Sequence, residues 1–248
     1  MAYPCPAVGQ AMHATMQPGS QAFESWGPDS LKAWTPAAFP AGDGTMWHWA
    51  EPGAKATTKD GLLELSAPRF TRSHDQVQIF DNPKHLVACS RQIPVPKEGL
   101  VVETILGATM HGATTTAWGH GFASFNLMDF AGGYVLDGLA NGARTAILFE
   151  RLHIPGLIPQ EQAFTAIADG PASTPGQMHA LRFQVEPQAR RIQGWIDGQP
   201  VLDWRNAPAI ASFTPGFGLI TLEPIAGGRS VSLKGQGCTG RLGPIRVA

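Results

Sequence analysis

The chain has 248 residues, with 18 Lys and Arg against 19 Asp and Glu, and a formal net charge of −1. Its 29 Gly and 21 Pro interrupt the sequence too often for a helical bundle or a coiled coil, and a hydrophobic content of 43% near neutrality excludes intrinsic disorder. We therefore expect a turn-rich β protein. The balanced charge and the lack of a Lys/Arg cluster argue against nucleic acid and anionic membrane surfaces as partners.

Short β-rich runs follow one another along the chain, separated about every 8–12 residues by turn residues, as in β-sandwiches. We expect an arm over residues 1–22 and a single domain over residues 23–248, since no shift in composition marks a second domain. The expected strands occupy residues 61–67, 75–80, 86–95, 99–110, 121–130, 134–139, 143–154, 162–169, 179–186, 190–197, 200–204, 217–223 and 243–248. Only one or two helical turns at residues 30–34, and another near 158–163, are expected, which excludes Rossmann and α/β-barrel folds.

One hairpin carries the most specific pattern in the sequence. The segment HALRFQVEPQARRIQGWIDGQPVLDW (179–204) reads as strand, turn and strand, and its Asp197-Gly198 pair supplies the two positive φ angles of a tight turn. An aromatic residue two positions before Asp-Gly resembles the hairpin of concanavalin A-like lectins and glucanases. The resemblance implies a jelly roll whose last strands are residues 217–223 and 243–248.

A narrower resemblance covers residues 118–205, about a third of the chain. These residues are similar to an uncharacterised bacterial domain family of jelly-roll type, in which a YERL segment stands where this chain has Phe149-Glu150-Arg151-Leu152. The Trp195-Ile196-Asp197-Gly198 segment lies close to the W-x-x-DG hairpin of that family. The resemblance implies an all-β, single-domain antiparallel sandwich with very little helix, and it brings no settled activity.

Two motifs of known chemistry do not predict a site here. The residues 235–240 fit the letters G-x-G-x-x-G, but a phosphate-binding loop opens a helix, and the Arg-Leu-Gly-Pro that follows cannot form one. We expect a hairpin loop at this segment. The E-x-D-x-E strand of retaining jelly-roll glucanases, which puts two carboxylates on one face, is absent from the sequence.

Two glutamates stand in the middle of otherwise apolar strands. Glu103 and Glu150 are notable because glutamate is depleted in strands and costly to bury unpaired. Two interpretations stay open for each. The side chain points to solvent or pairs with Arg144, Arg151 or Arg182, or it lines a pocket.

A strand after the Gly/Thr-rich connection at residues 111–121 is predicted to have one mixed face. Period-two alternation places on this face His120, Phe122, Ser124, Asn126 and Met128. Polar and aromatic side chains together suit the wall of an amphipathic cavity, with ordinary surface or core as the alternative. His120 is a candidate general acid/base near Glu103 or Glu150, because histidine titrates near neutrality.

The remaining aromatic, histidine and cysteine residues give weaker signals. Trp47 and Trp49 share one face of an extended segment, where they form a sugar-stacking platform or close an edge of the sandwich. The histidines lack the tight spacing of metal ligands, so we expect no metal, and no cofactor is implied. Cys89 is expected to be a small buried hydrophobe. No secretory signal is recognisable near the N-terminus, so we expect a cytoplasmic protein.

Three functional hypotheses follow. The first is a cofactor-independent isomerase, cyclase or lyase of specialised metabolism that acts on an apolar metabolite, with catalytic His120, Glu103 and Glu150 and with a binding wall of Trp118, Phe122, Asn126 and Arg144. The second is a carbohydrate-binding or glycan-processing module that stacks sugars on Trp47, Trp49 and Trp118. The third is a non-catalytic structural protein, which the lack of a cavity above roughly 300 Å³ would favour.

Overall fold

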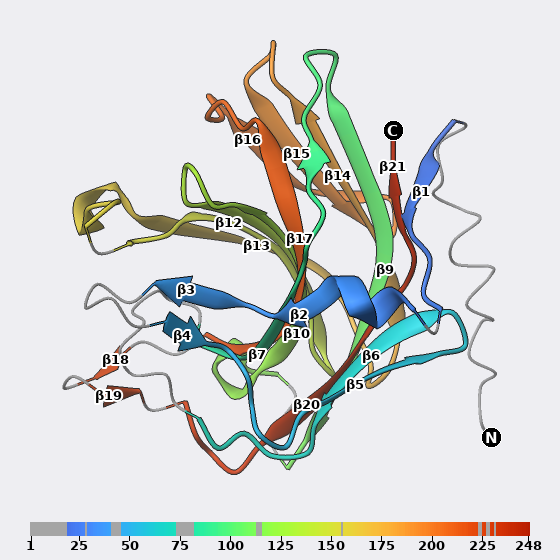
Figure 1. Cartoon of the computed structure of the whole chain (residues 1–248), viewed down its shortest axis with the longest axis vertical. Coiled ribbons are helices and arrows are strands. Elements are labelled where there is room, and N and C mark those ends of the chain that lie inside the picture. Colours follow the sequence, from blue (N-terminus) through green and yellow to red (C-terminus); the bar gives the residue numbers. More distant parts are fainter. Residues whose placement is uncertain are drawn as a thin grey trace.

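The computed structural model describes residues 19–27, 29–40, 46–72, 82–112, 116–154, 156–222, 225–226, 229–230 and 232–248, and they form almost only antiparallel strands (Figure 1). In these residues the helices are three short 3₁₀ turns: η1 (Ser30–Ala33), η2 (Trp118–His120) and η3 (Gln160–Gln162). In the described part, no helix is long and apolar enough to cross a membrane. The expected all-β class is confirmed.

Two large sheets make up the sandwich. The first sheet has the order β16-β15-β14-β9-β20-β6-β5, and β21 pairs with both β9 and β1. Its strands are β1 (Gln21–Glu24), β5 (Lys55–Lys59), β6 (Leu62–Ala67), β9 (Leu100–His111), β14 (Met178–Glu186), β15 (Arg191–Ile196), β16 (Gln199–Arg205), β20 (Gly237–Leu242) and β21 (Ile245–Val247). Figure 1 shows β1 beside β21, and Gln21 and Ala22 stand opposite Val247 and Arg246.

The second sheet has the order β13-β12-β11-β10-β17-β7-β2, with β8 paired to β17. Its strands are β2 (Trp34–Pro36), β7 (Asn82–Cys89), β8 (Ile93–Pro94), β10 (Phe122–Asp129), β11 (Tyr134–Ala140), β12 (Arg144–Arg151), β13 (Phe164–Ala172) and β17 (Ser212–Thr221). Two small ribbons complete the described fold: β3 (Ala38–Pro40) with β4 (Met46–His48), and β18 (Ile225–Ala226) with β19 (Arg229–Ser230).

The turn residues lie where the sequence predicts them. Asp197 and Gly198 both have positive φ, 52° and 76°, and join β15 to β16. Asp60 and Gly61 do the same between β5 and β6, with φ of 52° and 72°. The strand expected at residues 75–80 lies outside the described residues.

The segment 235–240 differs from expectation, because residues 237–242 form the strand β20 between β9 and β6 rather than a hairpin loop. Its glycines serve close packing. A Cβ on Gly240 would lie 2.6 Å from the Cβ of Ala123 in the facing sheet, and one on Gly237 would lie 2.2 Å from the Ala67 carbonyl oxygen. Glycine within a strand often marks such an approach, and the composition of the segment conceals the strand.

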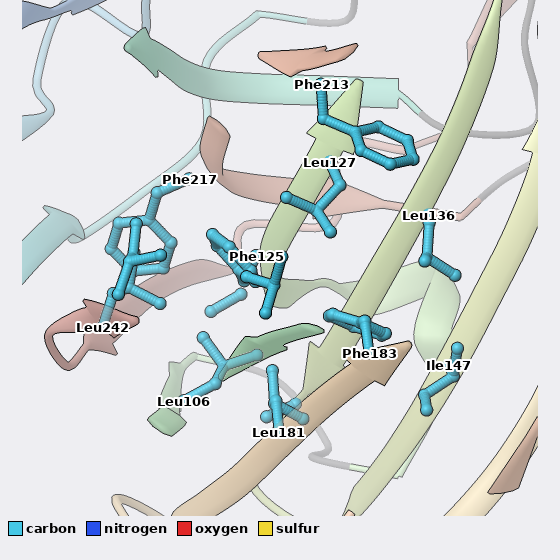
Figure 2. Packing of buried hydrophobic residues seen from close by; sticks show 14 of the residues in the cluster. Leu106, Phe125, Leu127, Leu136, Ile147, Leu181, Phe183, Phe213, Phe217 and Leu242 are labelled. Carbon is cyan, nitrogen blue, oxygen red and sulfur yellow. The ribbon is translucent and has the colours of Figure 1, made fainter. Parts of the chain in front are cut away.

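The hydrophobic core lies between the two sheets (Figure 2). Leu106, Leu181, Phe183 and Leu242 of the first sheet face side chains of the second sheet, namely Phe125, Leu127, Leu136, Ile147, Phe213 and Phe217. Cys89 is buried as expected, and Cys238 is buried too. Burial raises the pKa of the Cys238 thiol to about 12, so this cysteine is an inert core residue.

Candidate functional site

The side chains of the second sheet divide between the core and the opposite side, which we call the outer face. Along β10, Phe125 and Leu127 join the core, so period-two alternation turns Ser124, Asn126 and Met128 to the outer face. The predicted face is therefore correct for this strand. Its side chains are almost completely buried even though they point away from the core, because other segments cover them.

A small pocket lies on the outer face. Most of its lining is apolar, and the polar side chains are Asn126, Asp137 and Glu150. The apolar lining consists of Trp49, Pro83, Leu86, Met128, Val135, Leu152 and Ile220. The cavity volume is about 30 Å³, which is room for two or three water-sized groups. A ligand larger than this volume would insert only part of itself into the cavity.

The polar side chains of the pocket come from three adjacent strands. Asn126 of β10 stands opposite Asp137 of β11, and Glu150 of β12 stands opposite Val135. Asp137 and Glu150 are therefore diagonal neighbours, with Cα atoms about 7–8 Å apart. All three polar side chains are at most 2% exposed. The antiparallel register alone brings these polar groups together.

Two hydroxyl groups orient this polar cluster. The Ser124 hydroxyl donates to Asn126 Oδ1 at 3.2 Å, and the Thr165 hydroxyl donates to Glu150 Oε2 at 3.0 Å. Thr165 lies on β13, directly opposite Glu150. Hydrogen bonds of this kind fix the rotamers of buried polar groups and preorganise them for a ligand.

Trp49 forms part of the pocket wall because its backbone is anchored to β7. The Trp49 N–H donates to the Ala37 carbonyl at 3.0 Å, and the Leu86 N–H donates to the Trp49 carbonyl at 3.0 Å. Trp49, Ala37 and Leu86 then pack with Met128 and Leu152 in one apolar cluster. The wall is thus a segment laid across the outer face, held by backbone hydrogen bonds.

Hydrogen bonds of Glu51 also anchor the segment that carries Trp49. The buried Glu51 carboxylate accepts the Thr71 N–H at 2.9 Å, the Arg72 N–H at 3.2 Å and the Thr71 hydroxyl. The Glu51 N–H donates to His85 Nδ1 at 3.3 Å. Burial lowers the pKa of His85, with the nearby Glu51 charge opposing the shift, so the ring is neutral and can accept this bond.

Glycines keep the space beside Asn126 open. Gly216 of β17 pairs with Asn126, and a Cβ there would lie 2.6 Å from Met128 Cε and 3.4 Å from Asn126 Cβ. A Cβ on Gly218 would lie 3.1 Å from Ser124 Oγ and from Leu86 Cδ1. Larger residues at either position would fill the pocket or displace its wall.

The structure brings together only some of the residues predicted for a site. Trp49, Asn126 and Glu150 line the pocket. Glu103 lies on the first sheet, where Arg182 donates to it at 2.9 Å, so the ion-pair interpretation holds for this glutamate. His120 is half-buried in η2 and is not among the residues that line the pocket. The acid/base set of His120, Glu103 and Glu150 is not assembled.

Trp118, Phe122 and Arg144 lie together at one end of the second sheet. The Trp118 ring packs edge-on against Phe122 at 5.6 Å, and the Arg144 guanidinium lies over it at 5.0 Å. Arg144 also pairs with Asp169 at 2.6 Å. Trp47 lies in β4, and its side chain is outside the described residues.

Asp137 is the main residue that the sequence reading missed. It stands between Leu136 and Gly138 in an apolar strand, so it met the same criterion that singled out the two glutamates. Its partners across the sheet are set by register, which the sequence does not show. A search for every mid-strand carboxylate would have found it.

A Ser–His–Asp set also occurs, at the end of the sandwich where β13 leads to β14. His179 Nδ1 lies 2.7 Å from Asp197 Oδ2, and His179 Nε2 lies 2.9 Å from Ser173 Oγ. Burial alone would raise the pKa of Asp197, but hydrogen bonds from His179 and the Ala180 N–H hold it below its usual value. These distances resemble those of a hydrolase triad.

The surroundings of this set are those of a structural tie. The Ser173–His179 bond is buried, so a substrate has no access to the serine hydroxyl. The neighbouring backbone donors are occupied: the Ser173 N–H binds the Ala143 carbonyl, and the Thr174 N–H binds Gln177 Oε1. An oxyanion needs such donors free. Within the described residues, no cluster of three or more His, Cys, Asp or Glu side chains could hold a metal ion.

Comparison with known proteins supports the fold and leaves the function open. A family model described as "Family of unknown function (DUF6081)" matches residues 29–248. No curated protein sequence matches the chain. As expected, the chain is therefore similar to a family whose function is unknown.

Solved structures with the same fold are distant in sequence. The LamA E269S variant from Z. galactanivorans, in complex with laminaritriose and laminaritetraose, aligns with a TM-score of 0.56 at 12% identity, over 92% of this chain and 96% of that one. The GlcNAcα1-4Gal-releasing endo-β-galactosidase from Clostridium perfringens gives 0.56 at 11% identity, over 94% of this chain and 62% of that one. The metal-free Emp46p carbohydrate recognition domain gives 0.51 at 10% identity, over 88% and 89%. The predicted concanavalin A-like jelly roll is confirmed.

Proposed function

This chain belongs to the DUF6081 family, whose function is unknown, and we propose that it binds carbohydrate through the outer-face pocket. One observation carries the proposal: buried carboxylates and an amide converge among apolar walls on one face of a jelly-roll sheet. Sugars present hydroxyl groups that both donate and accept, together with apolar C–H faces. A site with a few fixed polar groups in an apolar surround is suited to them.

The fold relatives support the same proposal. The proteins named above include a carbohydrate recognition domain, a glycan-releasing enzyme and a complex with laminari-oligosaccharides. Because their sequence identity to this chain is low, their ligands are not transferred to it. They make a glycan the first class of ligand to test.

The small-molecule isomerase, cyclase or lyase has less support. Its acid/base set is not assembled, since Glu103 lies on the other sheet in an ion pair. An apolar metabolite needs a cavity of about 300 Å³ or more, and the described pocket measures about 30 Å³. A glycan does not need to be engulfed, because it can lie across a surface and insert one substituent.

Hydrolysis of a glycosidic bond is a second candidate, favoured by the neighbouring carboxylates Asp137 and Glu150. Glycosidases use two carboxyl groups about 5–9 Å apart, one as an acid and one as a nucleophile or base. Asp137 and Glu150 stand at diagonal positions with Cα atoms about 7–8 Å apart, so side chains of this length can bring their carboxyl groups into this range. The E-x-D-x-E arrangement is absent, so any such chemistry would draw its carboxylates from two strands rather than one.

The test is a glycan-array screen of the purified chain, followed by calorimetry on the best ligand. The pocket variant Asp137→Asn/Glu150→Gln is expected to lose at least tenfold in affinity, because each change removes a charge-assisted hydrogen bond. The matched control Glu64→Gln alters a carboxylate of the first sheet that pairs with Arg241, and it should bind normally. No glycan bound by the native chain at millimolar concentration would refute the proposal and favour the structural hypothesis.

Chromatography of the bound oligosaccharide after incubation separates binding from hydrolysis. Cleavage that is lost in both Asp137→Asn and Glu150→Gln supports the second candidate, whereas binding without cleavage leaves a lectin-like protein. Cytoplasmic location and the exclusion of nucleic acid and membranes stay predictions.

A further inference from the structure

The size of the pocket limits which part of a sugar can enter it. Its volume of about 30 Å³ accepts two or three water-sized groups. A hexose ring with its hydroxyl groups is several times larger. The pocket therefore holds a single substituent of a sugar, and the ring stays outside.

The pocket also has an unused donor. Asn126 is 2% exposed and its Oδ1 accepts the Ser124 hydroxyl, while its Nδ2 has no hydrogen-bond partner among the described residues. Because Asn126 lines the pocket, this N–H can donate to an acceptor atom of a ligand there. The substituent must therefore carry a hydrogen-bond acceptor.

Acceptor groups of the protein lie across from this donor. Glu150 stands two strands away from Asn126 and two residues further along, so their Cα atoms are about 12 Å apart, and Asp137 lies on the strand between them. A carboxylate offers about four acceptor positions, so Glu150 can accept a ligand N–H in addition to the Thr165 hydroxyl. A donor on one side and acceptors on the other match a ligand group that has a hydrogen-bond acceptor at one end and a donor at the other.

The walls favour a group that also carries apolar atoms. Leu86, Met128, Val135 and Leu152 face the same small space. A hydroxyl group would satisfy the polar side chains, but it would leave this apolar surface without a contact. An acetamido group has a carbonyl and an N–H that point in opposite directions, and a methyl group beside them.

We propose, on the basis of the carbohydrate-binding function above, that the ligand is an N-acetylated sugar whose acetamido group fills the pocket. Asn126 Nδ2 donates to the acetamido carbonyl oxygen. The acetamido N–H donates to the Glu150 carboxylate, and the methyl group packs on Met128 and Val135. The pocket thus selects one substituent rather than a whole sugar.

The test compares pairs of sugars that differ only at this substituent, N-acetylglucosamine with glucose and N-acetylgalactosamine with galactose, by calorimetry on the native chain. The expected preference for the acetylated member of at least one pair is tenfold or more, because an unpaired buried polar group discriminates strongly. Equal affinity within both pairs overturns this inference and leaves carbohydrate binding intact. No binding of any sugar overturns the proposed function as well, so the two failures are distinguishable.

Two variants localise the preference. Asn126→Ala should reduce the preference at least fivefold, and Val135→Leu, which fills the pocket, should do the same. The matched control Gln184→Ala changes an amide on the outer side of the first sheet and should keep the native preference. A native preference in both pocket variants, with unchanged melting curves, would contradict the assignment. If a variant does not fold, the comparison of sugar pairs on the native chain still decides.

Discussion

Glu103 and Glu150 are both buried in the middle of strands, but their neighbours on the two sheets differ. Glu103 lies on the outer side of the first sheet, opposite Arg182, which donates to it at 2.9 Å. Glu150 lies on the outer face of the second sheet, where its cross-strand partners are Val135 and Thr165. The Glu103 carboxylate pairs with the Arg182 guanidinium, and Glu150 lines the pocket.

A similar contrast separates the ion pairs of the first sheet from the pocket of the second sheet. On the first sheet, acidic and basic side chains form ion pairs, with Glu64 paired to Arg241 and Asp203 paired to Arg191 and Arg205. On the second sheet, the polar side chains at the pocket are Asn126, Asp137 and Glu150 among apolar neighbours. The charged side chains of the cross-strand ion pairs already have partners within the protein. A face with buried acceptors and apolar walls is instead suited to a ligand.

The largest effect is expected from removing the cation on the first sheet. Arg182→Met leaves the Glu103 carboxylate, 6% exposed, without its guanidinium partner. Removing one partner of a buried ion pair costs about 3 kcal/mol, so the free energy of unfolding in urea should fall by about that amount. The double variant Glu103→Leu/Arg182→Leu should recover most of the loss. Little loss in the single variant would mean that the Arg182 guanidinium does not stabilise the buried Glu103 carboxylate, and the contrast would fail.

The sequence predicts the strand faces and the turns, but it does not predict the partner of Glu103 or the pocket around Glu150. Alternation along residues 122–128 and the Asp197-Gly198 turn are local, so they could be predicted correctly. Which cation faces Glu103 depends on a register between residues 79 positions apart. The pocket likewise needs three strands and a covering segment, and therefore Asp137 was missed. The strand at residues 237–242 was missed because glycine is typical of turns, and the close packing that requires glycine here involves residues of other strands.

The two faces should also differ in their response to pH. His85 holds the segment that carries Trp49, and burial lowers the pKa of its ring below the ordinary 6.5. Between the folded-state pKa and about 6.5, His85 is protonated in the unfolded chain but neutral in the folded chain. The free energy of unfolding should therefore rise with pH in this range, by at most about 1.4 kcal/mol per pH unit. Urea unfolding between pH 5 and 7 should show this slope in the native chain and a smaller one in His85→Gln.

On the first sheet, the hydrogen bond from Arg191 holds the pKa of Asp203 below 3.8. Its contribution is present above the unfolded-state pKa and is lost only as the pH falls further, through the folded value. The Asp203 ion pair should therefore leave the slope between pH 5 and 7 unchanged, which Asp203→Asn tests. An equal change of slope in His85→Gln and Asp203→Asn would show that the pH response does not distinguish the faces.

The smallest effect is expected at the exposed ion pair of the first sheet. Arg241 donates to Glu64 at 2.8 Å, but its side chain is 47% exposed, and water and salt screen such pairs. Arg241→Ala should lower the free energy of unfolding by about 0.5 kcal/mol or less, and the difference should vanish in 1 M salt. A loss as large as that of Arg182→Met would mean that cross-strand pairing, and not burial, decides the strength of these pairs. Glu103 and Glu150 would then differ only in which residue faces them.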